Sequence, residues 1–431
     1  MVSRRQALKF IGSIPVMIYL PQIMSYASAG EPKPFPPETE ATIYRATGPD
    51  PGEITRRMVD SLGGIGKFID KDNIVILKVN SQWWNQGMTN TDVIAEFVRI
   101  ILEIPGFAGE IVLADNNQSE TPGGRGWTTD KRNGRFNYNE LVGYFNDKGH
   151  PNVTKYHWHP AGPNPNPLQF GGSGNSVVGH PSEGDGYVWQ EDLYYECPHG
   201  NRCLLAYPIF TSAFSGVTID LKNGAFRDGQ YTGQPVKFIN FAAMNHHGPY
   251  AGVTAAVKNY MGVVDMSCGY PGPTPDGTFN THHIGASATF RWMAHHRRTI
   301  RMVPFVREFY ERHPVFRFRY TAGVLGKYMR EIRRADLNII TAIRIGWGDR
   351  LDPAMAYQAD TVLASTDPVA LDYWATANIM LPATIEVGAP DYYRKLNNPD
   401  IADGPLHTFL QECRRELGGT MDPARIEIVE S

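Results

Sequence analysis

The sequence of 431 residues lacks the short motifs through which common cofactors are bound. No Gly-x-Gly-x-x-Gly follows a strand-like segment, no Walker loop occurs, and no Cys-x-x-Cys-His segment is present. These absences argue against bound NAD, ATP or covalently attached haem. The segment 171–175 comes closest to a nucleophile elbow, but asparagine replaces its last glycine, so a serine hydrolase is not indicated.

Cysteine and net charge are also low. The chain has 4 Cys, and the spacing of Cys197 and Cys203 is not that of a ferredoxin cluster or a zinc ribbon. This pair either closes a disulfide or remains two thiols, and a metal or cluster site is the alternative. The net charge of -3 argues against a general nucleic-acid-binding protein.

Long apolar runs are absent except near the start of the chain. Arg4 and Arg5 precede the apolar run 10–20, and the small residues 27–29 follow it. This order resembles a twin-arginine signal peptide over 1–29, and an ordinary secretory signal is the alternative. The run is shorter than the ~20 residues of a membrane span. We therefore expect export by the twin-arginine machinery to the periplasm, with no stable membrane span after cleavage.

Strand-like and helical segments alternate along the chain, which predicts an α/β fold. The apolar run 72–80 is typical of a strand buried on both faces, 90–102 has apolar residues at helical spacing, and 109–115 is the next strand. Strand, helix and strand in ~40 residues form a parallel βαβ unit. Further strands are predicted at 236–243, 337–345 and 360–365, and further helices at 252–262, 368–379 and 406–417.

We expect a single domain over 30–431, with a mostly parallel sheet and helices on both faces. Gly, Pro, Asn and aromatic residues dominate 117–200, which predicts a long aromatic-rich loop insertion. Its aromatic side chains either pack this loop onto the domain or line a ligand cleft. The arginine-rich segment 285–335 predicts a helical excursion, either salt-bridged in solvent or basic toward an acidic partner or anionic lipid.

Polar side chains follow several predicted strands at the point where each strand ends. In open α/β sheets, ligands bind outside the carboxyl ends of the strands. We therefore expect a shared site there, although an aspartate in such a position also caps the next helix. The residues concerned are Lys78 and Asn80, Asp115 with Asn116, His246 with His247, and Asp367.

The predicted helix 252–262 carries a lysine, Lys258, with apolar neighbours. Thr254 lies four residues earlier and shares its face. Burial lowers the pKa of a lysine toward that of a base. Lys258 therefore either faces a substrate carboxylate or phosphate, assisted by helix N-terminal amides, or forms a salt bridge to Asp115 or Asp265.

Four segments of the chain occur together in one known family: 76–80, 112–115, 252–262 and 363–372. On these segments the chain resembles the domain of unknown function 362 family over roughly 72–380. The third segment is the most specific, since members read Gly-Val-Thr, an aliphatic stretch, Lys-Asn and Gly. A preceding Lys-Thr-His block of the family reads Asn245-His246-His247 here, so asparagine replaces the family lysine. Many members carry ferredoxin-like cysteine motifs, which this chain lacks. The resemblance implies a fold and a set of positions rather than a reaction.

Adjacent histidines supply candidate metal ligands. His247 and either His282 or His283 are expected to join Asp115 around a transition metal, because imidazole and carboxylate suit such ions. No His-Glu-x-x-His spacing is present to specify such a site. The alternative is that His246 or His247 acts as a general acid or base without a metal.

These observations predict an exported enzyme, of undetermined reaction, that acts on a small anionic or polar substrate at the strand ends. The alternative is a non-catalytic periplasmic ligand-binding protein or a subunit of a periplasmic complex. In the enzyme hypothesis, one group of residues performs proton transfer or holds the metal: Asp115, His247 and Lys258. A second group contacts or orients the substrate: Lys78, Asn80, Thr254, Asn259 and His246.

Overall fold

The computed structural model describes residues 33–116, 125–158, 177–198, 202–264, 277–278, 281, 284 and 319–431. The expected signal peptide, His282 and His283, and most of the expected helical segment 285–335 lie outside these ranges. Within these ranges, no helix combines the length and the apolar character that a bilayer crossing requires.

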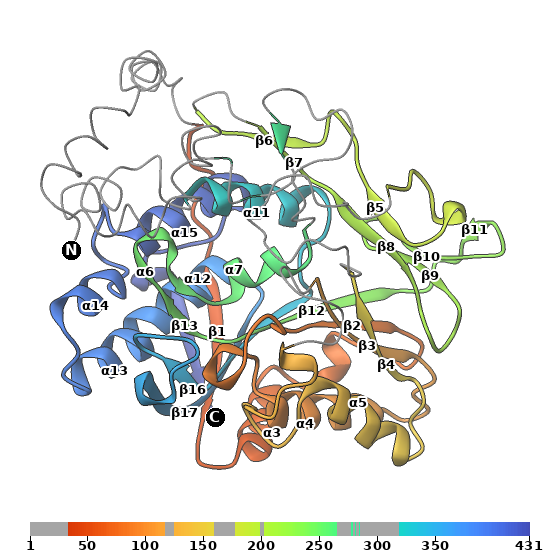
Figure 1. Cartoon of the computed structure of the whole chain (residues 1–431), viewed down its shortest axis with the longest axis horizontal. Coiled ribbons are helices and arrows are strands. Elements are labelled where there is room, and N and C mark those ends of the chain that lie inside the picture. Colours follow the sequence, from red (N-terminus) through yellow and green to blue (C-terminus); the bar gives the residue numbers. More distant parts are fainter. Residues whose placement is uncertain are drawn as a thin grey trace, which may run out of the picture.

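A large sheet forms the centre of the molecule (Figure 1). Its main strands lie in the order β18-β1-β17-β16-β12-β2-β3-β4. Within this order β17 runs antiparallel to both neighbours, whereas the other neighbouring strands pair in parallel. The mostly parallel α/β fold is thereby confirmed. The strands are β1 (Ala41–Thr47), β2 (Ile74–Lys78), β3 (Glu110–Asp115), β4 (Val153–His157), β12 (Val236–Ala242), β16 (Leu337–Gly346), β17 (Ala356–Ser365) and β18 (Ile426–Glu430).

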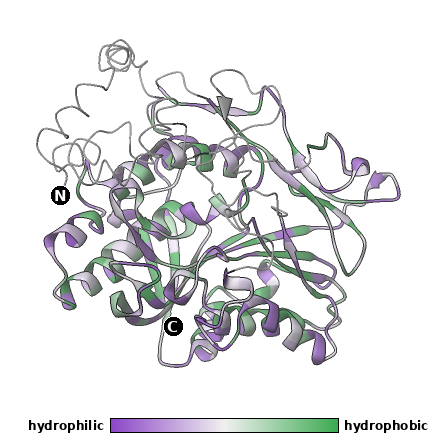
Figure 2. Ribbon diagram, in the orientation of Figure 1, coloured by the Kyte–Doolittle hydropathy of each residue, from purple (hydrophilic) through white to green (hydrophobic). Residues whose placement is uncertain are grey.

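Helices cover both faces of this sheet, which explains why the central strands β2 and β3 are buried along their whole length and mostly apolar (Figure 2). In β2, Val75 and Leu77 join the core on one face, whereas Ile74 and Ile76 join the core on the other. The first core includes α3 (Pro51–Ser61), α4 (Thr91–Leu102) and α5 (Tyr138–Asp147). The second includes α7 (Ala256–Asn259), α11 (Arg319–Glu331), α12 (Pro368–Ala375) and α15 (Pro405–Leu417).

The predicted βαβ unit is present. Its helix α4 begins after Asn90, whose side chain accepts hydrogen bonds from the backbone of Asp92 and Val93. The chain then runs from β2 through β3 to β4, away from β12 and β16 on the other side of β2. The order of strands therefore reverses between β2 and β12. Such a switch point leaves a crevice at the carboxyl ends of the strands.

Regular structure lies both within the predicted insertion 117–200 and directly after it. Helix α5 and strand β4 belong to the main domain, because β4 pairs in parallel with β3. Trp127 and Tyr138 are buried in the core of the main domain, so these two aromatic residues pack the chain rather than line a ligand cleft. A second sheet has the order β11-β10-β9-β8-β5, and a third has β15-β7-β6. These strands are β5 (Gly186–Val188), β6 (Tyr194–Glu196), β7 (Arg202–Leu204), β8 (Tyr207–Thr211), β9 (Thr218–Asp220), β10 (Gly224–Arg227), β11 (Gln230–Tyr231) and β15 (Gly277–Thr278).

Cys197 and Cys203 are buried thiols and are not joined to each other. The Cys197 sulfur donates to the Ile284 carbonyl at 3.8 Å, and the Cys203 sulfur donates to the Leu204 carbonyl at 3.7 Å. The structure therefore shows the thiol alternative.

The prediction of one helix over 252–262 is wrong in its first part. Strand β13 (Asn245–His247) leads into α6 (Gly248–Ala251), and β14 (Gly252–Thr254) then pairs back onto β13. Gly252 has a φ of 69° and lies against Leu406, where a Cβ atom would come within 2.7 Å of that side chain. The β-branched residues that follow it favour a strand. Helix therefore begins only with α7 and continues into a 3-10 turn, Tyr260–Gly262.

Two further helices, α13 (Leu381–Glu386) and α14 (Asp391–Leu396), follow α12 after a π-helical turn at Thr376–Met380. Helix α14 packs against α13 and α6.

Candidate functional site

A small cavity lies at the switch point, where β2 and β3 end beside the turn that contains α7. Its volume is about 20 Å³, which is room for roughly one water molecule. Three lining residues that the sequence did not single out are Gln82, Trp83 and Arg350. Seven residues predicted from the sequence line it together: Lys78, Asn80, Asp115, Asn116, Thr254, Lys258 and Asn259.

Lys78 and Asp115 form a buried ion pair at the bottom of this cavity. Their side chains are 2% and 3% exposed, and Lys78 Nζ lies 3.1 Å from Asp115 Oδ1. The ammonium also donates to the Val79 carbonyl at 2.7 Å and to Asn259 Oδ1 at 2.9 Å. An ammonium has three donors, so none is left for a substrate. Burial lowers the pKa of Lys78, and Asp115 counteracts that effect.

The Asp115 carboxylate is saturated as well. Its Oδ2 accepts from the Ser81 backbone at 2.7 Å and the Ser81 hydroxyl at 2.8 Å. Its Oδ1 accepts from the Asn116 backbone at 3.0 Å in addition to Lys78. A carboxylate offers about four acceptor positions, and these contacts occupy them. The geometry therefore favours a structural role for this pair over the direct substrate, proton-transfer or metal roles expected from the sequence.

Asn259 and Gly262 fix the ion pair from the side of α7. The Asn259 amide donates to Asn240 Oδ1 at 2.8 Å and to the Phe241 carbonyl at 2.9 Å, which ties α7 to the end of β12. At Gly262, a Cβ atom would lie 2.0 Å from Asp115 Oδ1 and 2.2 Å from Lys78 Nζ. Only glycine lets the backbone approach so closely.

Lys258 differs from Lys78 because its charge has no counterion in the described part of the chain. Its ammonium makes no hydrogen bond and no ion pair with the described residues. Burial, together with the positive charges of Arg350 and Lys78, lowers the pKa of Lys258 to about 7. Near neutral pH this amine is therefore partly unprotonated.

Arg350 is the second cation without a paired carboxylate at the cavity. It lies over the ring of Trp83, with its guanidinium carbon 4.5 Å from the ring centroid. Its Nη1 lies 3.1 Å from His247 Nδ1, and the Thr254 hydroxyl lies 3.0 Å from the same nitrogen. Because arginine only donates, Nδ1 of His247 is the acceptor. His247 thus holds Arg350 in place and makes no contact with Asp115 in the described structure.

His246 points away from the cavity, since adjacent residues of a strand face opposite sides. Its Nδ1 lies 2.7 Å from Asn397 Oδ1, and its ring packs edge-on against Tyr393. Burial lowers the pKa of His246 to about 4, so the ring is neutral. The structure does not bring His246 together with the other predicted site residues.

Two amide side chains complete the polar lining. Asn116 is fully buried, and its Oδ1 has no hydrogen-bond partner among the described residues. Such an orphaned acceptor calls for a donor such as a water or a ligand hydroxyl. The Asn80 side chain also makes no hydrogen bond within the described structure and is 8% exposed.

A metal site of the expected kind is not formed by the described residues. No group of three or more His, Cys, Asp and Glu side chains gathers within the described ranges. His282 and His283 lie outside those ranges. The saturated Asp115 is a poor fit for a metal ligand.

Asp372 supports the cavity from behind, and the sequence analysis did not single it out. Its carboxylate accepts from the backbone of Ala256 at 2.7 Å and of Val257 at 2.9 Å. These are the first amides of α7. The sequence had predicted that such amides assist a substrate, but Asp372 already occupies them. Burial raises the pKa of Asp372 to about 7.

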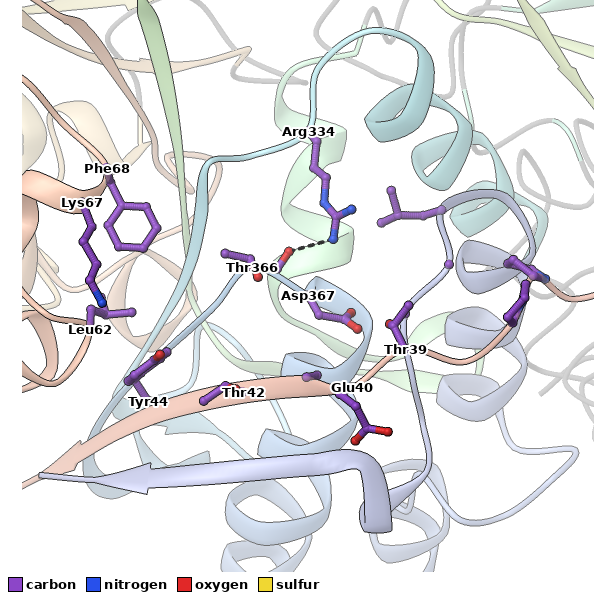
Figure 3. A pocket seen from close by; sticks show the side chains of 16 residues that line it. Thr39, Glu40, Thr42, Tyr44, Leu62, Lys67, Phe68, Arg334, Thr366 and Asp367 are labelled. Atoms are coloured by element: carbon purple, nitrogen blue, oxygen red, sulfur yellow. Dashed lines mark hydrogen bonds between the residues drawn. The ribbon is translucent and has the colours of Figure 1, made fainter.

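Asp367 lies at the opposite end of the sheet, where the parallel strands begin, beside a wider hollow of about 800 Å³ (Figure 3). The sequence placed it with the other strand ends, but β17 is antiparallel, so its last residue Ser365 pairs with Asn338 at the start of β16. Asp367 instead caps α12 through the backbone of Val369 and Ala370. The two cations of this hollow, Lys67 and Arg334, are both exposed, and Arg334 donates to the Thr366 carbonyl at 3.0 Å. We therefore place the candidate site at the smaller cavity.

The fold and the cavity define an open α/β protein with a positively charged crevice at its switch point. Residues 236–377 match the model of a family described as Domain of unknown function (DUF362). This match confirms the resemblance for that segment, which supplies Thr254, Lys258, Asn259 and Arg350 to the cavity. Comparisons with curated proteins and with solved structures find no match.

Proposed function

We propose that the protein is an exported enzyme that binds a small anionic substrate in the cavity at the switch point. The observation that carries this proposal is the charge balance of the lining: three cations, Lys78, Lys258 and Arg350, face one carboxylate, Asp115. Because Lys78 and Asp115 neutralise each other, two positive charges remain. Buried charge without a counterion is costly, and an anionic ligand removes that cost.

In this proposal the substrate anion binds Arg350, which suits a carboxylate because its planar fork donates two parallel hydrogen bonds. Lys258 lies beside it and exchanges a proton with the substrate, since its pKa is near neutral. Asn80 and Asn116 hydrogen-bond the polar remainder of the substrate. Lys78 contributes its positive charge and donates a hydrogen bond to Asn259, but it does not contact the substrate.

The test is calorimetric titration of the purified protein with acetate, lactate and sulfate. We expect at least one of these anions to bind, and Arg350→Gln to weaken that binding roughly 10- to 100-fold, since a charge-assisted hydrogen bond contributes about 1.5–3 kcal/mol. Arg344→Gln is the matched control, because Arg344 lies outside the cavity and donates to the Pro353 carbonyl. Equal loss in both variants, or no binding of any anion, contradicts the proposal.

The pH dependence of lactate binding follows from Lys258. Lactate keeps its charge across the neutral range, whereas Lys258 loses its proton as pH rises through about 7. Affinity is therefore expected to fall above that pH by linkage, and Lys258→Met should remove this dependence.

The alternative is a protein that binds its ligand without converting it. The hydrogen bonds that occupy all acceptor positions of Asp115 favour this alternative, because Asp115 then cannot transfer a proton. Lys258 is left as the main proton-transfer group. Incubation with each bound anion, followed by product analysis, distinguishes the two proposals. Binding without any chemical change supports the alternative.

The export route is tested separately. Replacement of Arg4 and Arg5 by lysine should hold the full-length chain in the cytoplasmic fraction of cells, because the twin-arginine machinery reads this pair. Unchanged export of that variant would indicate the general secretory route.

A further inference from the structure

The cavity is lined by the amine of Lys258, which has no counterion among the described residues, and by the guanidinium of Arg350. Lys78 has no donor left and Asp115 has no acceptor position left, so neither can react with a ligand. Lys258 is the lining residue that keeps a reactive side chain available within the described structure. Arg350 lines the same cavity and is held by His247.

Such surroundings favour the neutral, nucleophilic form of a lysine. Desolvation and nearby cations both destabilise the ammonium, and enzymes activate amine nucleophiles in this way. At Lys258 both causes are present, and they place its pKa at about 7. A cavity meant only to bind anions gains nothing from a lysine that loses its charge near neutral pH.

We propose that Lys258 forms a Schiff base with a small carbonyl compound that carries a carboxylate, a 2-oxo acid, with that carboxylate bound to Arg350. This inference rests on the proposed anion site and names the class of its substrate. The carbonyl group adjoins the carboxylate in such acids, so one molecule reaches both the guanidinium and the amine.

The reaction balances without an oxidant or reductant. The lone pair of the neutral amine attacks the carbonyl carbon, a carbon–nitrogen bond forms, and the carbonyl oxygen takes up a proton to give a carbinolamine. The carbon–oxygen bond then breaks, and the oxygen leaves with both amine protons as water. Asn116 Oδ1, which lacks a donor in the described structure, accepts the carbinolamine hydroxyl.

Entry of the acid requires the cavity to widen, since about 20 Å³ holds roughly one water. The contact between Arg350 and Trp83 forms part of its wall. A carboxylate competes for the guanidinium, so binding and opening are coupled: Arg350 leaves the indole ring as it pairs with the acid.

The experiment compares pyruvate with lactate, which has the same carboxylate but no carbonyl group. The purified protein is incubated with each acid and sodium cyanoborohydride, and intact mass and peptide mapping then locate any reduced adduct. We expect one pyruvate adduct per chain, at Lys258, and none with lactate. Lys258→Met should abolish the adduct, and Arg350→Gln should slow its formation at least tenfold.

Lys155→Met is the matched control. Burial also lowers the pKa of Lys155, but this lysine lies outside the cavity. Its replacement should leave the adduct unchanged. If pyruvate binds as lactate does but yields no adduct at Lys258, the inference is overturned. The proposed anion site then remains intact. If neither acid binds, the anion site itself is contradicted for small carboxylates, and the inference fails with it.

Discussion

Residue 262 shows how closely the backbone is packed against the buried ion pair. Gly262→Ala would place a Cβ atom 2.0 Å from Asp115 Oδ1, so the ion pair must move or break. We expect a loss of about 1–3 kcal/mol in the free energy of unfolding, as for other overpacked sites, together with weaker anion binding. Chemical denaturation and calorimetry measure the two effects.

Gly143→Ala is the control for this change. Gly143 lies within α5, where an added Cβ atom meets nothing within 4 Å. Because alanine is the better helix former, this variant should be stabilised by roughly 0.4–1 kcal/mol. A Gly262→Ala protein as stable as wild type would contradict the close approach described here.

Lys258 is expected to make the protein less stable in acid than at alkaline pH. Its pKa is about 7 in the folded chain and 10.5 ordinarily, so between these values the unfolded chain binds more protons. The free energy of unfolding therefore rises with pH across this window, and below about pH 7 the cost of the buried ammonium is fully present.

Lys258→Met should consequently be more stable than wild type at about pH 6, and the difference should shrink as pH approaches about 9. Each kcal/mol corresponds to roughly 1 °C in Tm for a chain of this length. Thermal unfolding at the two pH values measures this. A difference independent of pH would show that Lys258 keeps its charge in the folded protein.

Arg350 shows why one site residue escaped sequence analysis. Lys78 and Asp115 are the last residues of the buried strands β2 and β3, so the pattern of each strand indicated them directly. Arg350 lies four residues after β16 and returns to the cavity only because its loop folds back over Trp83. The predicted strand 337–345 therefore carried no comparable signal for it.

At the scale of elements, Asp372 positions α7 and thereby Lys258. Asp372→Asn replaces one of two acceptor oxygens by a donor that opposes a backbone amide of α7. We expect a cost of about 1–3 kcal/mol in the free energy of unfolding and a clear loss of lactate affinity, although Asp372 does not line the cavity.

The control for that change is Asp367→Asn. Asp367 caps α12 by similar bonds, and it lies at the opposite end of the sheet. In Asp367→Asn the amide oxygen can still cap α12, but the new NH2 group opposes the Thr420 backbone amide, so this variant should be destabilised by about 1–3 kcal/mol while anion affinity stays unchanged. If both variants lose affinity in proportion to their stability, Asp372 has only a structural role.

The sequence sufficed for elements whose pattern is local. The apolar run of β2, the Asn90 cap of α4 and the polar end of β3 each carried a complete signal, and the βαβ unit followed from them. The direction of β17 did not follow, although 347–355 is too short to contain a crossover helix between parallel strands. The strand β14 was not predicted. The four-residue spacing of Thr254 and Lys258 matches one helix face, and this spacing is the same whether Thr254 lies in a helix or in a strand.

At the scale of the whole molecule, two loops far apart in sequence together cover the cavity. Gln86 Nε2 donates to the Asp349 carbonyl at 2.8 Å and to the Asp352 carbonyl at 2.7 Å, which ties the loop after β2 to the loop after β16. Gln86→Ala should loosen this cover, speed the release of lactate about tenfold, and lower its affinity to match. Stopped-flow fluorescence, which reports on Trp83, measures the release rate.

Asn146→Ala is the comparison for this loop variant. The Asn146 amide bonds backbone carbonyls between α5 and β4, including that of Val153 at 2.8 Å, so a comparable set of hydrogen bonds is lost away from the cavity. Release of lactate should remain at the wild-type rate. An equal acceleration in both variants would mean that general loosening, and not the cover, governs release.

The lining of the cavity also determines when during synthesis the protein can first bind its ligand. Lys78 is made early, but Arg350 reaches the cavity only after most of the chain has left the ribosome. A nascent chain that ends before residue 350 therefore lacks the guanidinium on which anion binding depends. If the proposed anion site is correct, occupancy of the cavity marks a chain that has been synthesised beyond residue 350, and the proposed export route for folded proteins would receive a chain whose cavity is already assembled.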